Sequence, residues 1–176
     1  MMGMSSKEWS RFIHKELGVA ATPEEINADV VDLMSARYHE HLPHVPGARE
    51  AVERMAAVYP LAIASSSNRP LINVVLELAQ LTGYFGVVVS SEEVARGKPA
   101  PDVYLEAARR LRVEPKRCAA IEDSQSGIQS AKAAGMFVVA IPHRRYPPSE
   151  DAVAKADVVL ESIAELTPAT IGHAHA

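Results

Sequence analysis

The sequence predicts an α/β fold in which helices flank a parallel sheet, with a small helical unit preceding it. After residue 47, short apolar runs alternate with longer amphipathic segments. This alternation is typical of parallel strands joined by helical crossovers. Before residue 43 only the helical period appears, and Pro43 and Pro46 interrupt the chain between the two patterns. We therefore divide the chain into a helical unit, residues 1–43, and an α/β core, residues 44–176.

Composition indicates an ordinary globular protein that binds small molecules. The 176 residues are 48% hydrophobic and 23% charged, with a formal net charge of -4, which argues against disorder, a nucleic-acid-binding surface or a basic membrane surface. A single cysteine, Cys118, excludes an internal disulfide and fits a reducing compartment. No apolar run reaches membrane-spanning length, and Met1–Ser5 carries no signal-peptide pattern. We expect a cytoplasmic protein.

Capping chemistry predicts the first two helices. Ser5 and Glu8 have the spacing of a capping box, and apolar residues follow at helical intervals until Gly18. A second helix begins at Thr22, with Pro23 at its first position and Glu25 three residues after the cap. We expect these two helices to form a hairpin.

The hydrophobic pattern and the prolines and glycines that interrupt it predict the helices and strands of the core. Apolar runs predict strands, and segments bounded by proline or by a closing glycine such as Gly135 predict helices. The expected helices cover residues 48–58, 70–81, 101–111 and 124–134, and the expected strands cover residues 61–64, 86–90, 118–121, 137–141 and 157–160.

Two adjacent carboxylates, Glu122 and Asp123, follow the apolar run that begins at Cys118, where Ser124 and Gly127 open a helix. In parallel α/β sheets, ligands bind at the carboxyl ends of the strands. Neighbouring carboxylates repel each other unless a cation lies between them. Mg²⁺ is the expected cation, because it takes hard oxygen ligands and commonly bridges to phosphate. The alternative is a helix N-cap at Asp123 with a solvated glutamate before it.

Two further loops carry anion-binding chemistry. Ser65, Ser66, Ser67 and Asn68 follow a strand and offer hydroxyls, an amide and helix-start N–H groups to an anion, although a serine cluster is also a common turn. Lys98 lies in a loop stiffened by glycine and prolines, where its ammonium can neutralise a phosphate oxygen and offset the charge on Asp123. A solvated lysine is the simpler interpretation of that residue alone.

Taken together and in order, these motifs resemble the haloacid dehalogenase superfamily, and within it the β-phosphoglucomutase-like phosphatases and mutases. The resemblance covers residues 44–142 and implies a Rossmann-like core, with residues 1–43 as part of a helical cap that closes over the substrate. Combined motifs are far more specific than any one of them. The matching segments are residues 64–68, 97–102, 121–127 and 131–136.

The resemblance also implies residue roles. Ser65 would bind the transferring phosphate and Lys98 would stabilise it, so these two are the candidate catalytic residues. Ser66 and Asn68 complete the candidate phosphate and substrate site. Asp123 would ligate Mg²⁺ directly, and Glu122 would act through metal-bound water. The implied substrate is a small phosphorylated metabolite, hydrolysed through an aspartyl-phosphate.

One family feature has no counterpart here. The family's first strand carries an Asp-x-Asp pair, which supplies the nucleophile and the general acid and base, whereas Asp29 and Asp32 fall on the polar face of a predicted helix. The missing strand would be the central one, between the strands that end at Ser65 and Glu122. Loss of an essential nucleophile commonly costs a factor of about 10⁴ to 10⁶ in turnover, so we expect binding without efficient catalysis.

An empty central slot would leave backbone groups of both neighbouring strands unpaired, at about 1 to 3 kcal/mol for each buried group. We therefore expect the neighbours to pair with each other, a partner chain such as a second copy to fill the slot, or the natural protein to begin upstream of Met1. The last is the favoured expectation, in which the sequence is N-terminally truncated.

Several alternatives stay open. A sugar phosphomutase is one, although Ser6 and Lys7 stand where such mutases tend to carry arginine; a non-catalytic remnant that binds phosphate or Mg²⁺ is another. A metal-free haloacid dehalogenase is disfavoured, because it needs no Glu122–Asp123 pair. His39, His41 and His44 suggest zinc only weakly, because a proline hinge gives them no fixed scaffold.

Overall fold

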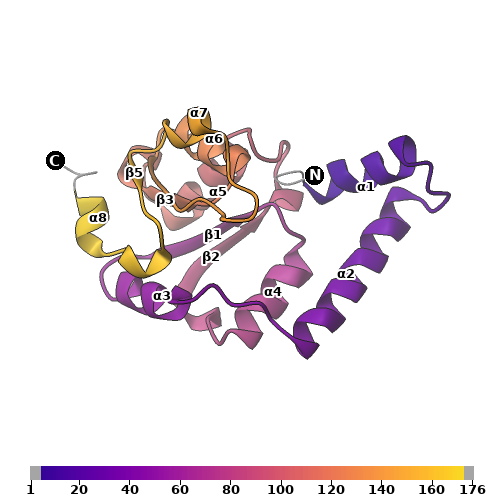
Figure 1. Ribbon diagram of the computed structural model, residues 1–176, viewed down its shortest axis with the longest axis horizontal. Coiled ribbons are helices and arrows are strands. Elements are labelled where there is room, and N and C mark those ends of the chain that lie inside the picture. The colour runs from indigo at the N-terminus through magenta and orange to yellow at the C-terminus, as the bar shows by residue number, and fades with distance from the viewer. Residues whose placement is uncertain (1–4, 173–176) are drawn as a thin grey trace.

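The computed structural model describes residues 5–172 and begins with a helical hairpin (Figure 1). Helix α1 (Ser6–Glu16) packs against α2 (Pro23–Glu40), which in turn packs against α4 (Arg69–Leu78) of the core. Both capping boxes form as predicted, because the Ser5 backbone N–H donates to Glu8 at 2.7 Å and the Thr22 backbone N–H donates to Glu25 at 2.8 Å. Local sequence alone therefore sets the start of each helix.

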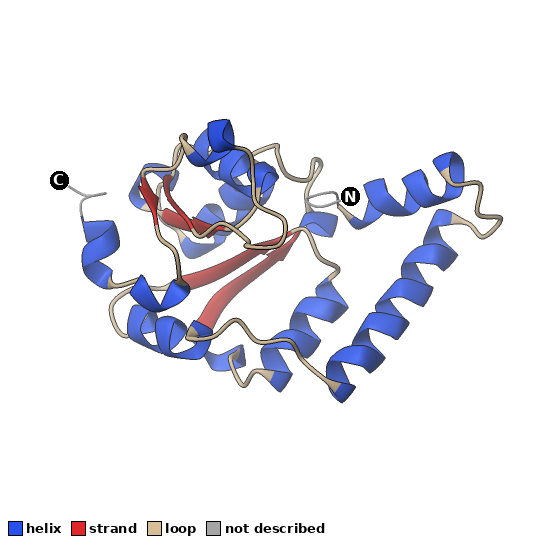
Figure 2. Ribbon diagram, viewed as in Figure 1, coloured by secondary structure: helices blue, strands red, loops and turns tan. Residues whose placement is uncertain are grey.

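The strands form two separate parallel sheets (Figure 2). One pairs β1 (Leu61–Ser65) with β2 (Phe85–Ser90), and the other has the order β3 (Ala119–Glu122), β4 (Phe137–Ala140), β5 (Val158–Val159). Parallel pairing and alternation with helices agree with the prediction.

The remaining helices connect these strands. They are α3 (Ala48–Ala56), α5 (Asp102–Leu111), α6 (Gln125–Ala133), α7 (Glu150–Val153) and α8 (Pro168–Gly172), with 3₁₀ turns at Thr82–Tyr84, Ser91–Glu93, Pro115–Arg117 and Ile163–Glu165. Within residues 5–172, no helix is both long and apolar enough to span a bilayer.

Strands β1 and β3 do not pair with each other in the described part of the chain, so each has one unpaired edge. All five β1 residues are half-buried rather than fully buried. Water therefore reaches part of this strand, which lowers the cost of its unpaired backbone groups below that of a dry interior. Of the three alternatives for the central slot, pairing of the neighbouring strands with each other is therefore not what residues 5–172 show.

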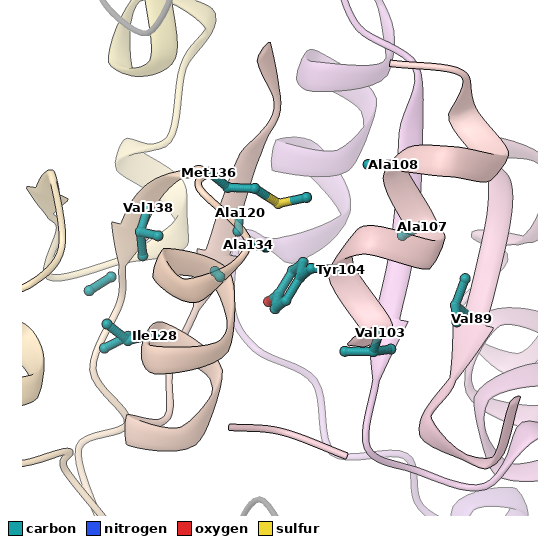
Figure 3. Close-up of a cluster of buried hydrophobic side chains, with 12 residues drawn as sticks. Val89, Val103, Tyr104, Ala107, Ala108, Ala120, Ile128, Ala134, Met136 and Val138 are labelled. Atoms are coloured by element: carbon teal, nitrogen blue, oxygen red, sulfur yellow. The ribbon is translucent and has the colours of Figure 1, made fainter. Parts of the chain in front are cut away.

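Helix α5 joins the two sheets through one apolar cluster (Figure 3). Val103 and Tyr104 of α5 pack in the same cluster as Val89 of β2 and Ala120 of β3, and Ala62 of β1 packs against it. Figure 3 shows Tyr104 in the middle of this cluster, pointing toward the helix that carries Ile128. The separate sheets thus share a core without sharing a hydrogen-bonded edge.

Strand β4 is covered on both faces. Val138 and Ala140 belong to the cluster around α5, whereas Val139 belongs to a second cluster with Met55 of α3 and Leu166. Alternate side chains of a strand point to opposite faces, so helices cover both sides of this sheet. That coverage explains why the β4 sequence is continuously apolar.

The hairpin meets the core through polar side chains. Ser5, Ser6 and Ser10 are buried, whereas Phe12 is 36% exposed and Leu17 is 60% exposed. The serine face of α1 is therefore buried, whereas Phe12 and Leu17 remain partly exposed.

Candidate active site

A buried ion pair lies at the carboxyl end of β3. The Lys98 ammonium hydrogen-bonds Glu122 Oε1, and the two side chains are only 9% and 5% exposed. Tyr104 donates its hydroxyl to the same oxygen, and Lys98 Nζ lies 3.4 Å from that hydroxyl. Burial raises the pKa of Tyr104 well above its ordinary value, and Glu122 raises it further, so the phenol remains a donor.

The loop that carries Lys98 is fixed from two sides. Ser130 of α6 donates to the Ala100 carbonyl at 2.6 Å, and Arg96 pairs with Asp102 at 2.7 Å at the start of α5. The loop thereby connects α5 and α6, which flank β3. A lysine held in this way keeps its ammonium at one place without ordering cost when an anion arrives.

The Glu122 carboxylate also lies against the first turn of α6. Ser124 donates to Glu122 Oε2 at 3.2 Å and accepts the Gly127 N–H at 3.2 Å, so Ser124 caps the helix, and the alternative that placed the cap at Asp123 is wrong. A Cβ atom added to Gly127 would lie 1.8 Å from Glu122 Oε2. Only glycine therefore fits at this point of the helix.

Asp123, one residue further, presents an exposed side chain at the same sheet edge. The surrounding protein removes part of the carboxylate's hydration, which raises the pKa of Asp123, and the charge of Glu122 raises it further. Lys98 and His143 act in the opposite direction more weakly. The ionised form of this carboxylate is therefore less stable here than it would be in water.

Proteins usually bind Mg²⁺ through one or two carboxylates, while water and phosphate supply the other ligands. The two carboxylates at this sheet edge match that pattern. Among residues 5–172, no group of three or more His, Cys, Asp and Glu side chains is placed to hold a metal ion. His39, for example, directs its Nδ1 to the Ser35 carbonyl at 2.8 Å. Asp123 is the best-placed ligand, since both Glu122 oxygens already accept protein hydrogen bonds.

The serine loop follows β1 at the corresponding end of the other sheet. Ser65 Oγ accepts the Ser67 N–H at 3.1 Å. Side chains from the end of β2 and from the turn after it hold the loop backbone, because Ser90 donates to the Ser67 carbonyl at 2.7 Å and Ser91 to the Ser66 carbonyl at 3.1 Å. The loop is therefore a well-formed turn, and within residues 5–172 the Ser65 hydroxyl hydrogen is not donated to another residue, so it can bind an anion.

Asn68 lies differently from the prediction. It is 3% exposed, and its amide nitrogen donates to Asn27 of α2 and to Glu92, both at 2.9 Å. Both amide hydrogens are therefore used. The remaining carbonyl oxygen is an acceptor, which does not suit a phosphate, so this geometry argues against Asn68 as an anion ligand and favours a role in holding α2.

Sequence reasoning missed Tyr104 and Glu92. Tyr104 completes the ion pair, and Glu92 accepts hydrogen bonds from Ser6 at 3.2 Å and from the Arg69 N–H at 2.9 Å, in addition to Asn68. Neither residue stands in a motif. The bonds named here, from Tyr104 to Glu122 and to Glu92 from Ser6, Asn68 and Arg69, join residues that are 18 to 86 positions apart, so no local signal could have indicated them.

Comparison with known proteins identifies the family. The family model described as haloacid dehalogenase-like hydrolase matches residues 1–141. The chain belongs to this family. Its phosphatase relatives include the bifunctional riboflavin kinase/FMN phosphatase of Arabidopsis thaliana, 32% identical over 94% of this chain, and hexitol phosphatase B of Escherichia coli, 35% identical over 79%. The chain spans 44% and 64% of the length of these two relatives.

Solved structures of this family share the fold. CbbY from Rhodobacter sphaeroides, crystallised in complex with phosphate, is 26% identical and superposes with a TM-score of 0.81 over 94% of this chain and 76% of CbbY. β-Phosphoglucomutase from Clostridium difficile gives the same TM-score at 21% identity. The fold is therefore that of the haloacid dehalogenase-like hydrolases, with its Rossmann-like core.

Proposed function

We propose that this chain provides the phosphate-binding and Mg²⁺-binding parts of a phosphatase-type hydrolase that acts on a small phosphorylated metabolite. The observation that carries the proposal is the buried Lys98–Glu122–Tyr104 cluster with Asp123 beside it, all at the carboxyl end of β3. The fixed ammonium can bind a phosphate oxygen, and the carboxylate beside it can bind Mg²⁺. Together they provide the charges that bind a phosphate with its metal ion. The two sequence relatives named above, from Arabidopsis thaliana and Escherichia coli, carry phosphatase in their names, which supports the same reaction class.

Each residue takes a role that follows from its geometry. Lys98 donates to a phosphoryl oxygen while Glu122 and Tyr104 hold its ammonium in place. Ser65 donates its hydroxyl hydrogen to the same phosphate, and the turn that includes Ser66 fixes it. Asp123 ligates Mg²⁺, and the negative charge of the neighbouring Glu122 strengthens the attraction of the site for the cation. When bound, Mg²⁺ would neutralise phosphate charge and orient the phosphoryl group.

The attacking carboxylate needs a separate source, because the sequence contains no Asp-x-Asp pair. In the part of the chain that the structure describes, strands β1 and β3 each have an unpaired edge, and both sheets are parallel. We propose that a further parallel strand, from an adjoining segment or another chain, pairs with these edges. It would place a nucleophilic aspartate beside Lys98 and Asp123 for an aspartyl-phosphate mechanism.

The test is complementation. A synthetic peptide with an apolar strand that ends in Asp-x-Asp is added to the protein with Mg²⁺ and p-nitrophenyl phosphate. We expect no turnover from either component alone and measurable turnover from the mixture. Asp123→Asn should abolish it, whereas Asp32→Asn, which removes the same charge from the exposed face of α2, should retain it.

Binding without turnover is the second candidate. The unpaired β1 and β3 edges and the absence of an Asp-x-Asp pair favour it for the chain by itself. Mg²⁺-dependent binding of inorganic phosphate with no turnover in the complemented mixture would support this candidate over the hydrolase. A sugar phosphomutase would instead convert one sugar phosphate isomer into another in that mixture without releasing phosphate.

A further inference from the structure

The loop between β4 and α7, residues 141–149, lies beside the candidate metal ligand. The His143 backbone N–H is 3.4 Å from the Asp123 carbonyl, and the His143 ring acts electrostatically on the Asp123 carboxylate. Prolines at 142, 147 and 148 limit the conformations of this loop. The loop therefore forms one wall at the same sheet edge as the phosphate site.

Aromatic contacts position the arginine of this loop. Tyr146 stacks on His143 with ring centroids 5.6 Å apart, and its backbone N–H donates to His143 Nδ1 at 3.1 Å. The Arg145 guanidinium lies over the Tyr146 ring, 5.6 Å from its centroid. A guanidinium placed on an aromatic ring keeps its N–H edge free to bind an anion.

Tyr146 also lines a pocket of about 310 Å³ with the residues that follow Asp123. Its other walls are Pro147, Pro148 and the first residues of α6, Ser124 to Ser126. This pocket is large enough for the body of a small metabolite whose phosphate is held at Lys98 and Asp123. Arg145 does not line this pocket itself but contacts Tyr146, which does.

The charge of this loop is not balanced within the described residues. Among residues 5–172, neither Arg144 nor Arg145 forms an ion pair, and both are exposed. By contrast, Arg69 and Arg110, on helices near β2, both pair with Glu93. Two unpaired arginines beside a phosphate site raise the local concentration of anions and can bind a second one.

We infer that Arg145, held by Tyr146, selects substrates that carry a second anionic group, a carboxylate or a second phosphate, next to the phosphoryl group that is transferred. This inference rests on the proposed function, because it assigns the rest of the substrate to the pocket beside that site. A carboxylate or phosphate oxygen pair matches the planar fork of the guanidinium, which a lysine cannot reproduce.

The test compares two ligands that differ only in the second group. Dissociation constants of 3-phosphoglycerate and glycerol 3-phosphate are measured by calorimetry with saturating Mg²⁺. We expect the wild-type protein to bind 3-phosphoglycerate about tenfold more tightly, as a charge-assisted hydrogen bond allows. Arg145→Gln should bring the ratio of the two constants close to one, and Arg145→Lys should restore part of it.

Arg117→Gln is the matched control. Arg117 is exposed and lies just before β3, at the opposite end of the strand from Asp123, so this variant loses the same charge away from the site. It should keep the wild-type ratio. Equal binding of the two ligands by the wild-type protein, or an unchanged ratio in Arg145→Gln, would overturn the inference alone. Failure of both ligands to bind would overturn the inference together with the proposed function.

Discussion

Glu122 is the residue on which the geometry of the site depends most. Sequence reasoning selected Lys98, Glu122 and Asp123 because each stands in a motif, and the structure brings these three together. It did not indicate that Lys98 and Glu122 bind each other, because they are 24 residues apart and their pairing depends on how α5 and α6 pack. The contribution of Tyr104 was hidden for the same reason.

Gly127→Ala tests the packing of Glu122 against α6. The new Cβ would overlap the carboxylate, which cannot move freely because Lys98 and Tyr104 hold it. We expect the free energy of unfolding in urea to fall by about 1 to 3 kcal/mol, as for other overpacked sites. Gly86→Ala is the control, since its Cβ would meet nothing within 4 Å; equal stability losses in the two variants would contradict this packing.

Asp123→Asn tests the electrostatics at the metal site. Because the folded-state pKa of Asp123 is raised, the folded protein binds more protons than the unfolded chain between the two pKa values, and this group lowers stability as pH rises through that window. In Mg²⁺-free buffer near pH 7, the variant should therefore be slightly more stable, by about 0.5 kcal/mol because solvent screens the exposed carboxylate.

This stability difference has a defined pH dependence. It should shrink as pH falls through the raised pKa and vanish well below 3.8, where Asp123 is protonated in both states. Near pH 7, saturating Mg²⁺ should make the wild-type protein more stable than Asp123→Asn, because the ion stabilises the folded wild-type protein by mass action. Urea unfolding at several pH values measures both effects; a variant less stable than wild type in Mg²⁺-free buffer would be the opposite result.

At the scale of single elements, local chemistry predicted most helices and strands but not how they pack. The capping boxes of α1 and α2 and the glycine after α6 fixed those boundaries. Short pieces such as α7 and α8 carry too few residues to show a period. The serine face of α1 was not predicted to be buried, because its partners belong to the turn after β2.

Glu92 links the hairpin to the core, and its removal should loosen that link. Glu92→Ala leaves Ser6 and the buried amide of Asn68 without this acceptor and removes the bond to the Arg69 N–H. We expect stability to fall by about 2 kcal/mol, as unsatisfied buried polar groups cost. Amide hydrogen exchange should accelerate in α1 and α2 more than in β3 and β4.

Glu77→Ala is the control for this experiment, because Glu77 is exposed on α4. It should leave both the stability and the exchange pattern close to wild type. Uniform acceleration over the whole chain in Glu92→Ala would instead mean that Glu92 stabilises the core in general and has no special role at the hairpin.

At the scale of the whole molecule, the sequence predicted the α/β class and the parallel pairing, but not the division into two sheets around α5. Apolar runs indicate strands without saying which edges pair, since pairing is decided by tertiary contacts. That division places the Ser65 turn on one sheet and the Lys98–Glu122–Asp123 group on the other. If the Ser65 turn and the Lys98–Glu122–Asp123 group form a single site, one phosphate must therefore contact residues of both groups.

Calorimetric titration of inorganic phosphate, with and without saturating Mg²⁺, tests this single site most directly. We predict that Mg²⁺ tightens phosphate binding about tenfold in the wild-type protein, as coupled ligands do. Asp123→Asn should abolish the coupling, Asp32→Asn should preserve it, and Ser65→Ala should weaken phosphate binding about fivefold. Phosphate affinity that is independent of Mg²⁺, or that is unchanged in Ser65→Ala, would contradict a common site across the two sheets.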